Sequence, residues 1–158
     1  MSVFTKIDGE KKAVWSKLSL NINGDICDFG TFQIRSADLA AHLAGCKHAI
    51  LFAATLGVPF DRELQKQSKL SPSRAYMLQM QGLREIEAFC DALCEEWAKE
   101  QNVTLRTRFS PGYGDLLLAV QHEIFRVLEP ARHIGLCLND SLVMSPSKSV
   151  TAFVGVEE

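Results

Sequence analysis

The chain has 158 residues and a formal net charge of −2, with 47% hydrophobic and 23% charged residues. These values are typical of one folded domain over residues 1–158 that buries a core without a metal or a disulfide. Its Lys and Arg residues are scattered, which argues against nucleic-acid binding, because a phosphate-binding face needs clustered cations. The N-terminus has no apolar signal core and no apolar run is long enough to span a bilayer, so we expect a cytoplasmic protein without a membrane partner.

Cysteines and histidines give no sign of a metal site. The cysteine count is odd and no pair has the C-x-x-C spacing, so we expect all five to fill the core in a reducing compartment. The histidines are widely spaced and are expected at the surface or its boundary. The residues concerned are Cys27, Cys46, Cys90, Cys94 and Cys137, and His42, His48, His122 and His133.

The first half of the chain predicts short elements separated by turn residues. A turn is indicated at residues 21–25 and a strand or hairpin at residues 26–34. Ser36 can cap a helix over residues 37–43 that Gly45 stops. Residues 49–56 then form an apolar run typical of a buried strand, and Pro59 suits the first turn of a helix to about residue 68.

One long central helix is predicted over about residues 72–99, with Pro72 in its first turn. Gly82 lowers helix propensity there and suggests close packing against another backbone. Two groups of residues are expected to face the core. The first is the apolar stripe of Leu83, Ile86, Cys90, Leu93 and Trp97, and the second consists of Tyr76, Met77 and Met80.

The second half predicts further short elements. A short strand is expected at residues 103–107, a loop at residues 110–115 and a helix at residues 116–128 that Pro130 breaks. Residues 134–144 and 149–156 are expected to be two strands joined as a C-terminal hairpin by residues 145–148. Because the strands and helices follow no regular βαβ order, the pattern favours an α+β fold with a largely antiparallel sheet packed with helices.

The segment from Arg108 to Asp115 carries the most chemistry. Gly112 and Gly114 let backbone N–H groups approach a ligand, and the guanidinium of Arg108 matches a carboxylate with two hydrogen bonds. Tyr113 offers an aromatic face to a cation. The same residues are also typical of an ordinary strand-to-helix loop in which Asp115 caps the following helix.

Several segments, in order along the chain, resemble the reactivation (activation) domain of cobalamin-dependent methionine synthase. The segment from Arg108 to Tyr113 is similar to the family's Arg-Pro-Ala-Pro-Gly-Tyr motif, and a Glu-Ala-Phe step begins at Glu87. Residues 134–144 and 147–153 resemble two later stretches of that domain. Residues 51–57 resemble short stand-alone relatives of the domain, so the resemblance is strongest from about residue 74 onward.

The resemblance implies a domain that binds S-adenosylmethionine and presents its methyl group to cobalamin. Arg108 would hold the methionyl carboxylate, backbone groups of Pro111, Gly112 and Tyr113 would line the ligand, and Glu87 would lie at the site. The partner would be a cobalamin-carrying methionine synthase that lacks its own reactivation domain, with a flavodoxin or ferredoxin as electron donor. Activity as an enzyme would then exist only together with that partner.

The chain also departs from the family pattern. It ends at Glu158, before a segment that carries tyrosine contacts to the ligand in the family, and it has no clear match for an aspartate contact upstream of the long helix. A weaker affinity for S-adenosylmethionine is the expected consequence. A non-catalytic module that docks a corrinoid protein or binds another small carboxylate is the alternative function. A stand-alone methyltransferase is disfavoured, because no glycine-rich loop of a doubly wound sheet is present.

Helix geometry gives an expectation for Glu87 that is independent of the family. At about 100° per residue it lies at the edge of the apolar stripe, whereas Glu85 points away and should be solvated. A partly buried carboxylate needs a partner, which Arg108 or a ligand ammonium would supply. A peripheral glutamate bridged to any neighbouring Arg or Lys is the other interpretation.

Overall fold

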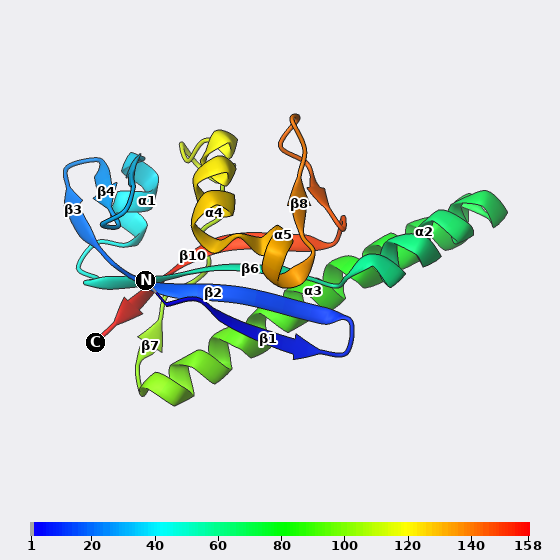
Figure 1. Ribbon diagram of the computed structural model, residues 1–158, viewed down its shortest axis with the longest axis horizontal. Helices are drawn as coiled ribbons and strands as arrows, with labels where there is room; N and C mark the ends of the chain where they lie inside the picture. Colours follow the sequence, from blue (N-terminus) through cyan, green and yellow to red (C-terminus); the bar gives the residue numbers. More distant parts are fainter. Residues whose placement is uncertain (1) are drawn as a thin grey trace.

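A five-stranded antiparallel sheet forms the centre of the molecule (Figure 1). The computed structural model describes residues 2–158. The strand order is β1-β2-β6-β10-β7, so both ends of the chain contribute to the same sheet. The strands are β1 (Phe4–Asp8), β2 (Lys11–Ser19), β6 (His48–Thr55), β10 (Ser149–Glu157) and β7 (Thr104–Leu105). The predicted α+β class with a largely antiparallel sheet is confirmed.

The two strands at the middle of the sheet are buried on both faces. Seven of the eight residues of β6 are buried, which confirms the buried strand predicted from the apolar run. Residues that face one side of the sheet pack on the long helix, and those on the other side pack on the smaller elements. Two separate apolar cores therefore form, one on each face.

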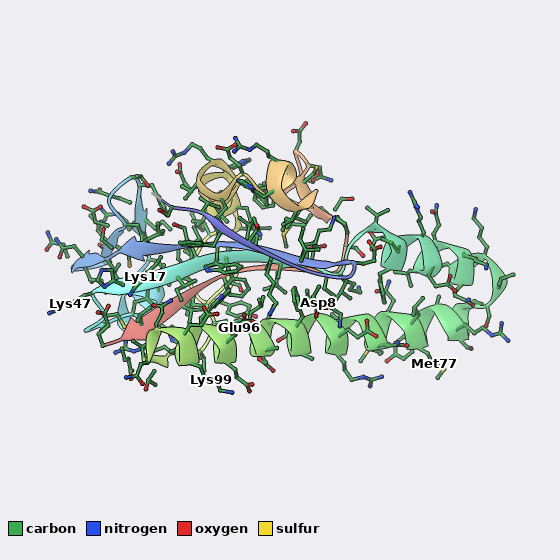
Figure 2. The ribbon with its side chains drawn as sticks, turned by 60° about the horizontal axis from the view of Figure 1, so that its bottom comes forward. Asp8, Lys17, Lys47, Met77, Glu96 and Lys99 are labelled. Carbon is green, nitrogen blue, oxygen red and sulfur yellow. The ribbon has the colours of Figure 1, made fainter. Side chains whose placement is uncertain are left out.

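The long helix is confirmed and runs further than predicted. Helix α3 (Pro72–Gln101) follows α2 (Val58–Leu70), and the Ser71 hydroxyl between them accepts a hydrogen bond from Arg74 N at 3.4 Å. Asn102 ends α3 in the left-handed conformation. The C-terminal part of α3 lies along the sheet, whereas its first turns and α2 extend beyond it as a helical hairpin (Figures 1 and 2). None of the helices within residues 2–158 is long and apolar enough to cross a bilayer.

Only the part of α3 that lies on the sheet buries its apolar stripe. Trp97 and its stripe neighbours from Ile86 onward are buried, but Leu83 is 49% exposed, so the predicted stripe is wrong at its first position. The expected core positions of Tyr76, Met77 and Met80 are also wrong, because these side chains lie on the projecting part of the helix. The two helices pack closely at Gly82, where an added Cβ would lie 2.3 Å from the ring of Phe60. The close neighbour of Gly82 is therefore a side chain and not the backbone that was predicted.

The elements on the other face are short. The hairpin predicted at residues 26–34 is confirmed as β4 (Ile26–Asp28) and β5 (Gln33–Arg35), with β3 (Asn21–Asn23) as a third strand. Helix α1 (Ala37–His42) has the predicted cap, because the Ser36 hydroxyl accepts from Leu39 N at 3.0 Å. The remaining elements are the 3₁₀ helix η1 (Leu118–Val120), α4 (Gln121–Leu128), α5 (Pro130–Ile134), β8 (Cys137–Leu138) and β9 (Met144–Ser145).

The C-terminal strands pair differently from the prediction. Strand β8 pairs with β9 in a small hairpin of their own, and β10 joins the central sheet between β6 and β7. Residues 134–144 are also not one strand, because Ile134 ends α5 and Gly135 follows in the left-handed conformation. The apolar composition of β10 explains its place, since a strand buried on both faces belongs in the middle of a sheet.

The sequence pattern predicts no element before residue 21, yet β1 and β2 lie there. Strand β2 pairs with β6 over eight residues, from Lys12 opposite Thr55 to Ser19 opposite His48. Lysines at the ends of β2 interrupt its apolar pattern, so its place in the sheet depends on this pairing rather than on a strong local signal.

Candidate functional site

The loop that follows β7 is held against the central sheet. Phe109 N donates to the Phe153 carbonyl at 2.9 Å, and Phe153 N donates back to the Phe109 carbonyl at 2.8 Å. Within the loop, Gly112 N donates to the Leu116 carbonyl at 2.8 Å, with Gly112 at φ 94°. A residue with a Cβ is strained at this φ, so glycine is required for the turn. The two backbone hydrogen bonds of Phe109 therefore fix the position of its neighbour Arg108 relative to the sheet.

Asp115 joins this loop to α1. Its carboxylate accepts from the Ser36 hydroxyl at 2.5 Å and from the N–H groups of Ala37 and Asp38 at 3.0 and 3.1 Å. Asp38 accepts in return from Asp115 N at 2.8 Å. Asp115 thus caps the distant α1, and the prediction that it caps the following helix is wrong. The bond from Ser36, with the two backbone bonds, lowers the pKa of Asp115 below 3.8 although burial opposes the shift.

The guanidinium of Arg108 lies between two carboxylates of α3. It donates to Asp91 Oδ1 at 2.6 Å and to Glu87 Oε2. The Arg108 side chain is 18% exposed, while those of Glu87 and Asp91 are 57% and 67% exposed. Partial burial alone would lower the pKa of Arg108, but the bond to Asp91 and the nearby negative groups offset it, so the pKa is raised. Arg108 is therefore held, charged, at the edge of solvent.

Glu87 has the predicted partner but not the predicted exposure. Its bond to Arg108 confirms one of the partners that the sequence left open. Glu87 is nevertheless exposed, whereas Glu85 is half-buried and accepts from Gln81 Nε2 at 2.9 Å, so the expectation that Glu85 is the solvated one is wrong. Sequence reasoning missed Asp91, although its position four residues after Glu87 places both on one helix face.

Two hollows meet at Arg108 and Tyr113. The smaller has a volume of about 230 Å³ and is lined by four of the five predicted site residues: Glu87, Arg108, Pro111 and Tyr113. Gly112 shapes the loop without lining this hollow. Its far wall comes from Leu142 and Met144 near β9, and from Gln121 and Thr151, whose side chains bond to each other at 2.8 Å.

The second hollow, of about 360 Å³, is also lined by Arg108. Asp91 and Cys94 of α3 form one wall, and Arg106 and Thr107 form another. Tyr113 lines both hollows and is 55% exposed, with its ring edge-to-face on Phe109 at 5.9 Å. An elongated ligand that contacts Arg108 can extend into either hollow.

The cysteines divide into buried and accessible groups. Burial raises the pKa of Cys90 to about 12 and that of Cys27 to about 11. Burial also raises the pKa of Cys94, which lines the second hollow, although Arg108 works against this. Cys137 is exposed, so the prediction that all five thiols fill the core is wrong for it.

The histidines lie at the surface or its boundary, as predicted. His42 is the one nearest the loop, with its Nε2 2.7 Å from the Thr107 carbonyl oxygen and its ring against Phe109. Within residues 2–158, no three His, Cys, Asp or Glu side chains are arranged to hold a metal ion.

The arrangement around Arg108 suits a zwitterion. A guanidinium can bind a carboxylate with two parallel hydrogen bonds, and the adjoining carboxylates of Glu87 and Asp91 can accept from an ammonium. The exposed ring of Tyr113 offers a face to a further positive group. An α-amino acid with a cationic side chain has this set of charges.

A structural comparison identifies the architecture. One similar solved structure is "Crystal Structure of the MetH Reactivation Domain bound to AdoHcy", with a TM-score of 0.70 over 93% of this chain. The chain has the fold of the MetH reactivation domain. It spans 58% of the length of that MetH reactivation domain chain and is 18% identical to it. No family model and no curated protein matches the sequence.

At 18% identity, the likeness to the MetH reactivation domain concerns the fold. It confirms the resemblance found in the sequence at that level. The roles of Arg108, Pro111, Gly112, Tyr113 and Glu87 in binding a ligand stay predictions.

Proposed function

We propose that this chain binds S-adenosylmethionine at Arg108 and supports the reductive remethylation of cob(II)alamin on a partner methionine synthase. The observation that carries the proposal is the position of Arg108 between Glu87 and Asp91, beside Tyr113 and two hollows. The fold supports it, because the similar MetH reactivation domain was crystallised with AdoHcy, the demethylated form of S-adenosylmethionine.

Binding of the amino-acid end is an exchange of partners. The ligand carboxylate displaces a protein carboxylate from the guanidinium of Arg108, and the displaced Glu87 or Asp91 accepts from the ligand ammonium. None of the three charged protein groups is then left without a charged partner. Tyr113 lines the same two hollows as Arg108, so its ring can lie beside the sulfonium of the bound ligand.

The role of the protein is to position the methyl donor. A corrinoid held by the partner and reduced with one electron from a flavodoxin or ferredoxin would supply the electron pair that accepts the methyl group. The C–S bond breaks with its electron pair retained on sulfur, so no proton has to move. The chain's residues therefore bind and orient the sulfonium, and activity requires the partner.

Titration calorimetry with S-adenosylmethionine and AdoHcy tests the binding step on the chain alone. The methylation step needs a cobalamin-loaded methionine synthase fragment that lacks its own reactivation domain, a one-electron donor and absorption spectroscopy for methylcobalamin. We expect heat of binding in the first experiment and methylcobalamin that depends on this chain in the second. No binding in the presence or absence of the partner would remove the proposal.

A non-catalytic module that docks a corrinoid protein is the second candidate. It is favoured by the saturation of Arg108, since both terminal nitrogens of the guanidinium already have carboxylate partners in the free chain. The variant Arg108→Ala separates the two functions. Under the first it abolishes remethylation while docking persists, and under the second a wild-type chain docks without any remethylation. Both candidates place the protein with a cytoplasmic partner, in keeping with its five free thiols.

A further inference from the structure

The projecting part of the α2–α3 hairpin buries little in this molecule. Helix α2 has no buried residue, and the first ten residues of α3 have none either. Both lie beyond the end of the sheet (Figures 1 and 2), with Met77 on the outer side of α3 in Figure 2. Helices in proteins obtain most of their stability from packing of an apolar face. In this hairpin one face is left uncovered by the rest of residues 2–158.

The uncovered face of the hairpin is apolar. Tyr76, Met80 and Leu83 follow one another at helical spacing on α3, and Met77 lies beside them. The exposed fractions are 66% for Tyr76, 70% for Met77, 38% for Met80 and 49% for Leu83. With Leu70 at the tip, 63% exposed, these side chains form what we call the hairpin stripe. Clustered exposed apolar side chains of this size mark interaction surfaces.

A groove of about 490 Å³ runs beside the stripe, between the two helices. Glu63 and Gln67 of α2 form one side, and Arg74, Gln81 and Arg84 of α3 form the other, with Met77 and Met80 at its edge. The groove thus has charged side chains on both helices and apolar methionines on α3, a combination that fits the surface of a second amphipathic helix.

Charge is segregated along the hairpin. Between residues 64 and 83, around the tip, the chain carries Lys66, Lys69 and Arg74 and no acidic residue. The base of the hairpin carries more acidic than basic residues. The acidic ones are Asp61 on α2 and Glu85, Glu87 and Asp91 on α3, against Arg62 and Arg84 on the same helices. Glu87 and Asp91 are also paired with Arg108.

We propose that the hairpin stripe binds the same stripe of a second copy of this chain, with the two hairpins antiparallel. A twofold axis near Met80 makes the contact self-complementary, as closed dimers require. The cationic tip of each copy then lies against the acidic base of the other, whereas a parallel arrangement would place like charges together. Glu87 is seven residues from the axis, or about 10 Å along the helix, so the tip of one copy reaches the edge of the other's Arg108 site.

Sedimentation equilibrium of the wild-type chain over micromolar to millimolar concentrations measures the association. We expect a mass that rises from the 17.5 kDa of one chain to twice that value, with weaker association at high salt. Met80→Glu and Tyr76→Glu should each weaken dimerisation by about tenfold or more, because they introduce a charge at the centre of the contact. Ile7→Glu is the matched control, since Ile7 is 66% exposed on the edge strand β1 and should leave the dimer unchanged.

Charge exchange tests the antiparallel arrangement. Lys69→Glu at the tip and Glu85→Lys at the base should each weaken the homodimer, since each places like charges opposite one another. An equimolar mixture of these two variants should recover the association, because in the mixed dimer both tips again face bases of opposite charge. Circular dichroism of each variant should match the wild type, which separates loss of the contact from loss of the fold.

A wild-type chain that stays at 17.5 kDa throughout the concentration range overturns the proposal. A dimer that Met80→Glu and Tyr76→Glu do not weaken also overturns it. If the chain stays monomeric and Met80→Glu lowers affinity for the cobalamin-carrying partner, the stripe belongs to that partner and self-association is rejected. None of these outcomes depends on S-adenosylmethionine binding, so the proposed function stands or falls separately.

Discussion

Arg108 on the loop after β7 donates a hydrogen bond to Asp91 on α3 at 2.6 Å, across seventeen residues of chain. Its other terminal nitrogen is bonded to Glu87 in the same way. The guanidinium that would bind a ligand carboxylate is therefore already occupied by two carboxylates of the protein. Ligand binding at this position is a competition, and the predictions that follow for the site depend on it.

Replacing Arg108 with Ala should weaken S-adenosylmethionine binding by about 10- to 100-fold, since hydrogen bonds to charged groups contribute about 1.5–3 kcal/mol. Calorimetry measures this directly. Arg132→Ala is the control, because Arg132 is exposed and pairs with the nearby Glu129, away from Arg108. Equal losses in the two variants would mean that Arg108 has no particular role. Global stability should change little, because both carboxylate partners of Arg108 are exposed.

Asp91→Asn and Glu87→Gln should act in opposite directions on ligand binding. The Asn side chain competes less with the ligand carboxylate for Arg108, so Asp91→Asn should raise affinity for S-adenosylmethionine by a few-fold, less than about tenfold. Glu87→Gln removes a negative group that can accept from the ligand ammonium, so affinity should fall. Calorimetric titration of both variants decides the matter, and a decrease in both would show that Asp91 also contacts the ligand.

The acid stability of the loop depends on Asp115. Its pKa is lowered in the folded chain, so its contribution is fully present above the ordinary value of 3.8 and is lost as pH falls through the lowered value. Asp115→Asn should therefore lower the melting temperature at pH 7 and flatten the decline below pH 4. Ser36→Ala removes the hydroxyl donor to Asp115 and the α1 cap together, at a cost of about 1 kcal/mol. Thermal melts of the three proteins between about pH 3 and 7 test this, and parallel pH curves would contradict it.

Gly82→Ala should destabilise the chain even though alanine favours a helix by about 1 kcal/mol. The added Cβ would lie 2.3 Å from the Phe60 ring, so the ring must move. Overpacking of this kind costs about 1–3 kcal/mol. Urea unfolding measures the change, with Phe60→Leu as a second background in which the loss should shrink. An increase in stability for Gly82→Ala alone would show that the hairpin is looser than its close contact implies.

Thiol labelling should follow burial. Cys137 is exposed and should react first with a disulfide reagent, and Cys94 should follow because it borders a hollow. Cys27, Cys46 and Cys90 should react only after unfolding, since burial keeps them in the thiol form, with the pKa of Cys90 at about 12. Peptide mass mapping of partly labelled protein gives the order. S-adenosylmethionine should slow labelling of Cys94 and leave Cys137 unaffected if the ligand occupies the hollow beside Arg108.

Local signals in the sequence predicted the elements that depend on neighbouring residues. The long helix from Pro72, the Ser36 cap and the buried strand predicted at residues 49–56 were all confirmed. Each depends on contacts within a few residues or on an apolar run that only a core can accept. The pairing of Glu87 with Arg108 was one of the alternatives that the sequence left open, and it was confirmed although Glu87 is not partly buried as expected.

The sequence by itself determined the α+β class, the main helix and the loop at residues 108–115. Only the tertiary structure decided that β10 pairs with β6 and that Asp115 caps α1. It also decided that the side chains of Tyr76, Met77, Met80 and Leu83 are exposed. Each of these depends on which distant segment lies opposite. An apolar stripe is the same whether a sheet covers it or ends short of it, and a carboxylate accepts from whichever N–H groups the fold brings near.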